Sequence, residues 1–199
     1  HYRNEKIGND YATRLSDIGR QSGFPRLPGT TDIYSHDQAY LIASGNKWDP
    51  RPVFQSYSVY TPWLAEKNRQ HLRGNTRPDN IIFNIQPIDR RLPSLEDGAS
   101  WPLILLKYRP TALAKGYLFL SALDKEPASD DYEVMISRSR HEMGEKIFVP
   151  DSPGLIFAKI SVDQSLIGKI YGFLFKPSNL NIDISTKRSN SRSYRFISG

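Results

Sequence analysis

Residues 31–85 read TDIYSHDQAYLIASGNKWDPRPVFQSYSVYTPWLAEKNRQHLRGNTRPDNIIFNI, and this stretch decides the fold. Its pattern alternates β-branched and aromatic runs with helical segments that begin at good capping residues. The predicted elements are a strand over 32–34, a helix over 36–44, a strand over 53–60, a helix over 62–73 and a strand over 80–85. The order β-α-β-α-β favours a mixed sheet whose first strands are parallel and joined by right-handed crossovers.

On either side of this stretch the pattern changes. Residues 1–29 predict a helical lead-in followed by a Pro- and Gly-rich linker, and residues 101–108 predict a short buried helix. Further strands are predicted over 116–123, 132–137, 146–149, 155–162, 169–175, 180–185 and 193–197. The fold class we predict is therefore α+β. We expect a single domain over 30–199, with an α/β half at 30–110 and an antiparallel β-rich half at 111–199 that share one core.

The composition excludes several classes of function. The 199 residues contain no cysteine, which excludes disulfides, thiolate metal sites and a cysteine nucleophile. The four histidines lack the spacing of a helical metal site, so we expect neither a metal nor a cofactor. The net charge is +6, but the basic residues are scattered and no nucleic-acid-binding motif accompanies them. We therefore expect no nucleic-acid partner.

The chain starts at His1 without an initiator Met. We interpret it as a piece excised from a longer polypeptide, with a mature processed protein as the alternative. No apolar run approaches the roughly 18 residues needed to cross a bilayer.

The densest polar and aromatic stretch is 51–62. Ligands of open α/β sheets sit beyond the carboxyl ends of parallel strands, and polar groups on a central strand are costly to bury unless they are paired. The candidate ligand-binding residues are Arg51, Gln55, Tyr57, Ser58, Tyr60 and Arg91. In the alternative interpretation, these polar groups bond to neighbouring backbone while the tyrosines fill the core.

Three carboxylates are weak candidates for general acid and base: Asp32, Asp89 and Asp97. Paired carboxylates perform glycoside chemistry, but only at a defined separation that the sequence does not supply. A loop such as 89–97, rich in Asp and Arg, is more typical of a structural ion-pair network.

Part of the sequence resembles a family of uncharacterised bacterial inner-membrane proteins. The matching residues include Asp32, His36-Asp37-Gln38-Ala39, Gly45, Trp48, Arg51 to Ser58, Tyr60-Thr61, Ile88-Asp89, Arg91, Pro93-Ser94-Leu95, Asp97-Gly98 and Trp101. The resemblance covers most of 30–109. It implies a multi-pass, glycosyltransferase-like membrane protein of which this chain is the soluble domain on the periplasmic side. The membrane-embedded remainder of the polypeptide would be its partner.

Three hypotheses about function follow. The first is a non-catalytic extracytoplasmic domain that binds a glycan, a lipid-linked sugar or a partner protein. The second is a structural or assembly module, for which a large exposed apolar patch would be the sign. The third is a glycan-processing enzyme, which requires two carboxylates to converge in one cleft.

Overall fold

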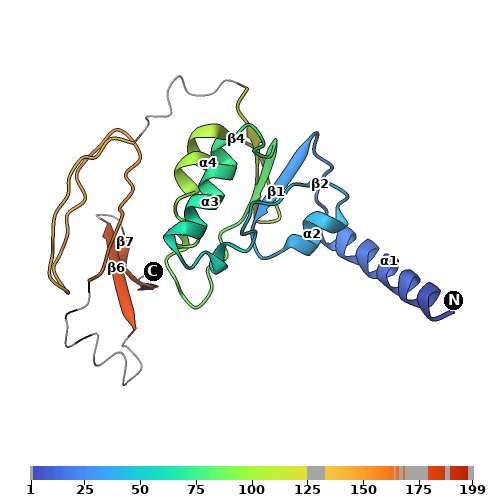
Figure 1. The fold of residues 1–199 in the computed structure, drawn as a ribbon, viewed down its shortest axis with the longest axis horizontal. Coiled ribbons are helices and arrows are strands. Elements are labelled where there is room, and N and C mark those ends of the chain that lie inside the picture. The colour runs from blue at the N-terminus through green and yellow to red at the C-terminus, as the bar shows by residue number, and fades with distance from the viewer. Residues whose placement is uncertain are drawn as a thin grey trace.

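The computed structural model describes residues 2–124, 133–163, 165, 168, 179–186 and 189–196 (Figure 1). The elements are α1 (Tyr2–Ser22), β1 (Thr30–Tyr34), α2 (Gln38–Ala43), β2 (Lys47–Trp48), α3 (Pro62–Arg73), β3 (Asn80–Phe83), α4 (Trp101–Lys107), β4 (Tyr108–Ala114), β5 (Tyr117–Ala122), β6 (Leu180–Thr186) and β7 (Ser189–Phe196). One-turn 3-10 helices lie at Ser56–Ser58 and Pro93–Leu95. Helices, a mixed sheet and a separate antiparallel hairpin confirm the predicted α+β class.

The main sheet has five strands in the order β2-β1-β3-β5-β4. Strand β1 pairs in parallel with both β2 and β3, with Asp32 opposite Ile81 in the second pair. Strand β5 then pairs antiparallel with β3 and with β4. The tight turn between β4 and β5 uses Lys115 and Gly116, both at positive φ. Up to β3 the chain follows a β-α-β-α-β order, but its middle strand is β2 and not the predicted strand at 53–60. The sheet is mixed because β5 runs antiparallel to β3.

Neighbouring residues of a strand point to opposite sides of the sheet, so both faces carry apolar side chains. Each face is covered by its own set of elements. On one face, Tyr34, Ile81 and Leu120 pack against α3 and α4 through Leu72 and Leu103. The other face packs against α2 and the segment after α1 through a second cluster: Phe24, Ile33, Leu41, Ile82, Tyr117 and Phe119. The sheet is therefore the middle layer of three, with α3 and α4 on the side opposite α2 (Figure 1).

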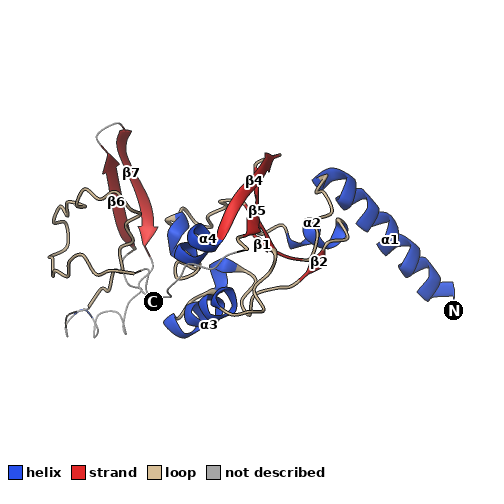
Figure 2. Cartoon of the chain, turned by 90° about the horizontal axis from the view of Figure 1, so that it is seen from above, coloured by secondary structure: helices blue, strands red, loops and turns tan. Residues whose placement is uncertain are grey.

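Two helices show how local sequence positions the elements. At the start of α3, Thr61 accepts a hydrogen bond from the N–H of Leu64 at 3.3 Å and Pro62 occupies the first turn, as the sequence predicts. Helix α1 contacts α2 near its C-terminal end, whereas its N-terminal part projects away from the sheet in both views (Figure 2). Within the described residues, no helix combines the length and the apolar character needed to cross a membrane.

The hairpin of β6 and β7 forms a separate two-stranded sheet. It touches the loop after β3, where the N–H of Arg195 donates to the carbonyl of Arg90 at 2.8 Å and the Arg195 guanidinium lies 3.6 Å from Asp89. A two-stranded ribbon is marginal by itself in water. Its contacts with residues 89–91 therefore help to hold the hairpin against the loop after β3.

Several strand predictions are wrong. Residues 53–60 are a loop with one 3-10 turn, and the second strand is instead the two-residue β2. Strands predicted over 146–149 and 155–162, and over the described part of 132–137, are absent because these residues make no sheet ladder with any described segment. Strand β4 was not predicted, since Pro110 interrupts its pattern. The predicted strand at 169–175 lies outside the described residues.

The contact between α1 and α2 gives a test of the packing. A Cβ at Gly19 would lie 2.9 Å from the carbonyl oxygen of Ala43, whereas a Cβ at Gly8 would meet nothing within 4 Å. Ala exceeds Gly in helix propensity by about 1 kcal/mol. We expect Gly8→Ala to preserve or raise the melting temperature and Gly19→Ala to lower it, as measured by circular dichroism. Equal effects of the two substitutions would show that α1 does not depend on this close approach.

Candidate functional site

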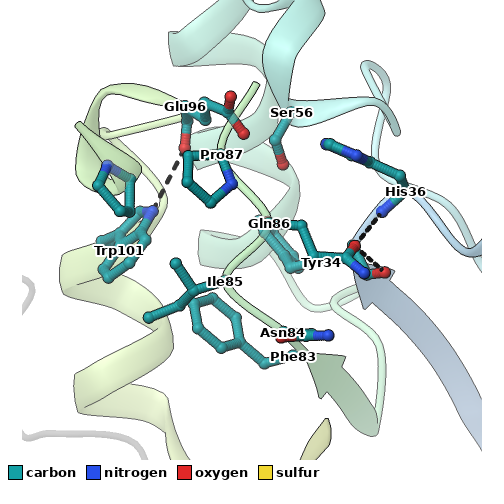
Figure 3. A pocket seen from close by; sticks show the side chains of 12 residues that line it. Tyr34, His36, Ser56, Phe83, Asn84, Ile85, Gln86, Pro87, Glu96 and Trp101 are labelled. Carbon is teal, nitrogen blue, oxygen red and sulfur yellow. Dashed lines mark hydrogen bonds between the residues drawn. The ribbon is translucent and has the colours of Figure 1, made fainter. Parts of the chain in front are cut away.

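A depression lies at the carboxyl ends of the parallel strands β1 and β3 (Figure 3). The chain leaves β1 towards β2 and leaves β3 towards β4 and β5, so the two connections separate at this point, which is where ligands of open α/β sheets bind. The depression has a volume of about 370 Å³, part of it open to solvent. Its lining comes from Tyr34, Ser35, His36, Ser56, Phe83, Asn84, Ile85, Gln86, Pro87, Pro93, Glu96 and Trp101.

One side of the depression is fixed by hydrogen bonds between the two strand ends. Oε1 of Gln86 accepts from the N–H of His36 at 2.9 Å and from the Ser35 hydroxyl at 2.6 Å. The Gln86 amide in turn donates to Asp37 at 2.7 Å. These bonds hold the exposed His36 at the rim, where its ring meets the edge of Tyr57 at a centroid distance of 5.1 Å.

Asp37 is the centre of this polar group. Burial raises its pKa, but hydrogen bonds from Tyr117, Gln86 and Ser35 outweigh burial, so the pKa lies below its usual value. Burial and the Asp37 carboxylate together raise the pKa of Tyr117 to about 12. Asp37 is therefore a charged acceptor at neutral pH, and Tyr117 is a neutral donor to it.

The opposite side is formed by the segment before α4. Nε1 of Trp101 donates to the carbonyl of Glu96 at 3.3 Å, and the indole packs edge-on against Phe83 at 5.3 Å. Oε1 of Glu96 accepts from the N–H of Ile88 at 3.0 Å. In Figure 3 the Glu96 carboxylate lies near Ser56, while Trp101 and Ile85 form an apolar wall.

Ser56 connects the depression with a buried cluster of charges. Nη2 of Arg51 donates to the Ser56 hydroxyl oxygen at 2.8 Å and to the carbonyl of Phe54 at 2.7 Å. Because the guanidinium occupies one acceptor site of Ser56, the hydroxyl proton remains available to another acceptor. Arg51 thus fixes the position of the loop that forms this wall.

Arg51 is enclosed by two carboxylates and an aromatic ring. Its Nη1 lies 2.7 Å from Oδ2 of Asp32, and its Nε lies 3.5 Å from Oδ2 of Asp97. The guanidinium carbon is 3.6 Å from the centroid of the Tyr34 ring, a cation–π contact. All three charged side chains have no exposed surface. Asn68 of α3 completes the cluster by donating to Asp97 at 2.9 Å.

The two carboxylates are held differently. Asp32 also accepts from the N–H of Ile33 at 2.8 Å and from Nε1 of Trp48 at 3.3 Å. Burial raises the pKa of Asp97 to about 6, against the opposing effect of Arg51. The pKa of Arg51 remains above its usual value, because its carboxylate neighbours outweigh burial. One buried cation therefore faces two carboxylates, and burial makes Asp97 easier to protonate than an ordinary aspartate.

The structure separates the residues that the sequence singled out. Arg51, Asp32 and Asp97 come together in the buried cluster. Asp89 is exposed on the loop after β3 and lies near Arg195. The remaining candidates lie in or beside the 51–60 loop: Gln55, Tyr57 and Ser58 are half-buried, Tyr60 is exposed, and Arg91 donates to the carbonyl of Tyr57 at 3.3 Å.

Sequence analysis missed most residues that line the depression. The rule that ligands lie beyond the carboxyl ends of parallel strands was applied to 53–60, which is not a strand. Applied to the strand at 80–85, the same rule selects Asn84 and Gln86. The sequence marks Trp101 as a ring that could stack on a sugar and Glu96 as one of a carboxylate pair, but their place at the depression depends on how α4 packs against β3.

Comparisons with protein-family models, with curated proteins and with solved structures found no match to this chain. Among the described residues, no group of three or more His, Asp or Glu side chains is placed to hold a metal ion.

The raised pKa of Asp97 predicts a pH-dependent stability. The folded pKa of about 6 exceeds the unfolded value of about 3.9, so folding takes up a proton between these values and stability falls as pH rises from 4 to 7. Two pK units correspond to about 3 kcal/mol. We expect Asp97→Asn to remove most of this decline, measured by urea denaturation at each pH.

Asp32→Asn is the matched comparison, because it leaves the Arg51 guanidinium without its closest carboxylate. Removing one partner of a buried ion pair costs about 3–5 kcal/mol. We expect that loss throughout the range from pH 4 to 7. Parallel stability curves for the wild type and Asp97→Asn would show that Asp97 has an ordinary pKa.

Proposed function

We propose that this chain is a ligand-binding domain that holds a glycan, or the sugar of a lipid-linked saccharide, in the depression at the ends of β1 and β3. We further propose that it is the periplasmic domain of a bacterial inner-membrane protein, as the resemblance of residues 30–109 implies. The observation that carries the binding proposal is the combination of an indole and apolar wall with fixed polar groups on the facing sides.

The chemistry of the lining favours a saccharide over other small molecules. A sugar ring presents C–H groups on its faces and hydroxyls around its rim, so it suits a site with an aromatic wall and a few placed donors and acceptors. Trp101 supplies the apolar wall, Ser56 the donor and Glu96 a charged acceptor. The imidazole of His36 adds a polar group at the open side.

Binding without turnover fits this site better than carboxylate chemistry. Asp32 and Asp97 converge on Arg51, and Asp97 is desolvated, as a glycan-processing enzyme would need. However, both side chains have no exposed surface, so they lie under the floor and not in a cleft. Neither carboxylate can reach a glycosidic oxygen in this arrangement.

Thermal-shift titration tests the binding proposal. The panel consists of bacterial glycans, muropeptides and polyprenyl-phosphate sugars, added to the intact chain. A ligand at about 100 times its Kd raises the unfolding free energy by about 2.7 kcal/mol. We expect a saturable shift that weakens at least tenfold in Kd for Glu96→Gln and for His36→Ala, since each removes a polar group from the rim.

Asp89→Asn is the matched control, because this exposed carboxylate lies on the loop after β3 but does not line the depression. It should bind like the wild type. A flat response across the whole panel, or an affinity that is the same in all variants, would contradict a saccharide site at this position.

A second function, as an assembly module, is favoured by the apolar side chains of residues 134–160. Val134, Met135, Phe148 and Val149 are all more than two-thirds exposed, and Phe148 reaches 89%. Apolar side chains that gather into one exposed patch mark an interaction site. If the module self-associates, Phe148→Asp should shift sedimentation towards the monomer without lowering the melting temperature. A wild type that is monomeric at all concentrations would exclude self-association.

A further inference from the structure

A hydrogen-bonded chain of Ser139, His141 and Glu145 lies in the segment 133–163, beside the β6–β7 hairpin and away from the depression (Figures 1 and 2). Oγ of Ser139 is 2.8 Å from Nε2 of His141. Nδ1 of the same ring is 3.0 Å from Oε1 of Glu145. A hydroxyl, an imidazole and a carboxylate are thus connected in the order that activates serine nucleophiles.

The backbone of this segment holds the carboxylate in place. Oε2 of Glu145 accepts from the N–H of Glu142 at 3.0 Å, and the N–H of Glu145 returns a bond to the carbonyl of Glu142 at 3.2 Å. Gly144 adopts a φ of 87°, a conformation that closes this turn and that glycine adopts without strain. Oε2 of Glu145 is therefore held by the backbone, and Oε1 is left to orient His141.

The carboxylate also determines the role of each ring nitrogen. Hydrogen bonds to His141 and to the Glu142 backbone lower the pKa of Glu145, so the group is an anionic acceptor at neutral pH. Nδ1 must then carry the proton, which leaves Nε2 of the neutral ring as an acceptor for the Ser139 hydroxyl. In this tautomer the imidazole is placed to remove the proton from Ser139 during attack.

The arrangement is accessible to solutes. Ser139, His141 and Glu145 are all exposed residues. The depression at the ends of β1 and β3 does not include Ser139. A short acyl group on an activated ester is the substrate that needs the fewest binding contacts.

We propose that Ser139 is a nucleophile that accepts a short acyl group from an activated ester, with His141 as general base and Glu145 as a positioning residue. A bond forms between Oγ and the carbonyl carbon while the bond from that carbon to the leaving oxygen breaks. Nε2 takes the hydroxyl proton and passes it to the leaving alkoxide. Water then releases the acid from the acyl-serine by the same proton path. This activity is independent of the proposed saccharide site.

Acetylation by p-nitrophenyl acetate tests the proposal on the intact chain. Peptide mass mapping measures the rate at which Ser139 gains an acetyl group. We expect this rate to be at least about tenfold higher in the wild type than in His141→Ala, since a positioned general base usually contributes about 10²–10⁴-fold.

Glu145→Gln separates orientation from a merely structural role, because the amide keeps an acceptor oxygen but removes the negative charge. We expect an intermediate rate and a displaced pH profile, with an unchanged melting temperature. Ser152→Ala is the control, since Ser152 is an exposed serine whose hydroxyl accepts only a backbone N–H at 3.1 Å among its bonds to described residues. Absence of acetyl-Ser139, or equal rates in the wild type and His141→Ala, would overturn the proposal.

Discussion

The structure depends on one buried guanidinium. Arg51 contacts Asp32 on strand β1, the carbonyl of Phe54 in the following loop and Asp97 just before α4. Asn68 of α3 reaches the same cluster through Asp97. Because these groups come from segments far apart in the sequence, a single side chain fixes the relative positions of the strand, the loop and both helices on one face of the sheet. An apolar residue at this position would fill the space without specifying those positions.

The charge balance of the cluster shows why it is specific and not simply stabilising. Burying ions is costly, and a buried pair often contributes less to stability than apolar residues of equal volume. Here the cost is increased by a second carboxylate, which the raised pKa of Asp97 reflects. The face of Tyr34 and the hydrogen bonds of Arg51 offset part of that cost. The cluster therefore lowers the stability of the fold, most strongly above pH 6, while it gives the loop a defined position.

The sequence predicted elements whose signals are local. The helix of α3 has its cap and proline at Thr61 and Pro62, and β1, β3 and β5 carry β-branched or aromatic runs. Residues 53–60 carry the same propensity but form a loop, because Arg51 bonds to Phe54 and Ser56 and draws the chain away from the sheet. That outcome depends on Asp32 and Asp97, which are distant in sequence. The location of a site at the strand ends was predictable, whereas its lining required the packing of α4.

The buried cluster and the depression have side chains in common, so folding itself positions polar groups of the depression. Ser56 and the Tyr34 ring belong to both, and Gln86 holds the strand ends at the other side. A ligand would therefore meet polar groups whose positions are already set by folding, so little conformational entropy is lost when it binds. Such preorganisation gives affinity to a shallow site that has few contacts to offer. Burying a second carboxylate lowers the stability of the fold, but the cluster holds the loop that forms one wall of the proposed site. This role explains why a charged cluster lies beneath a site whose ligand would not contact those charges.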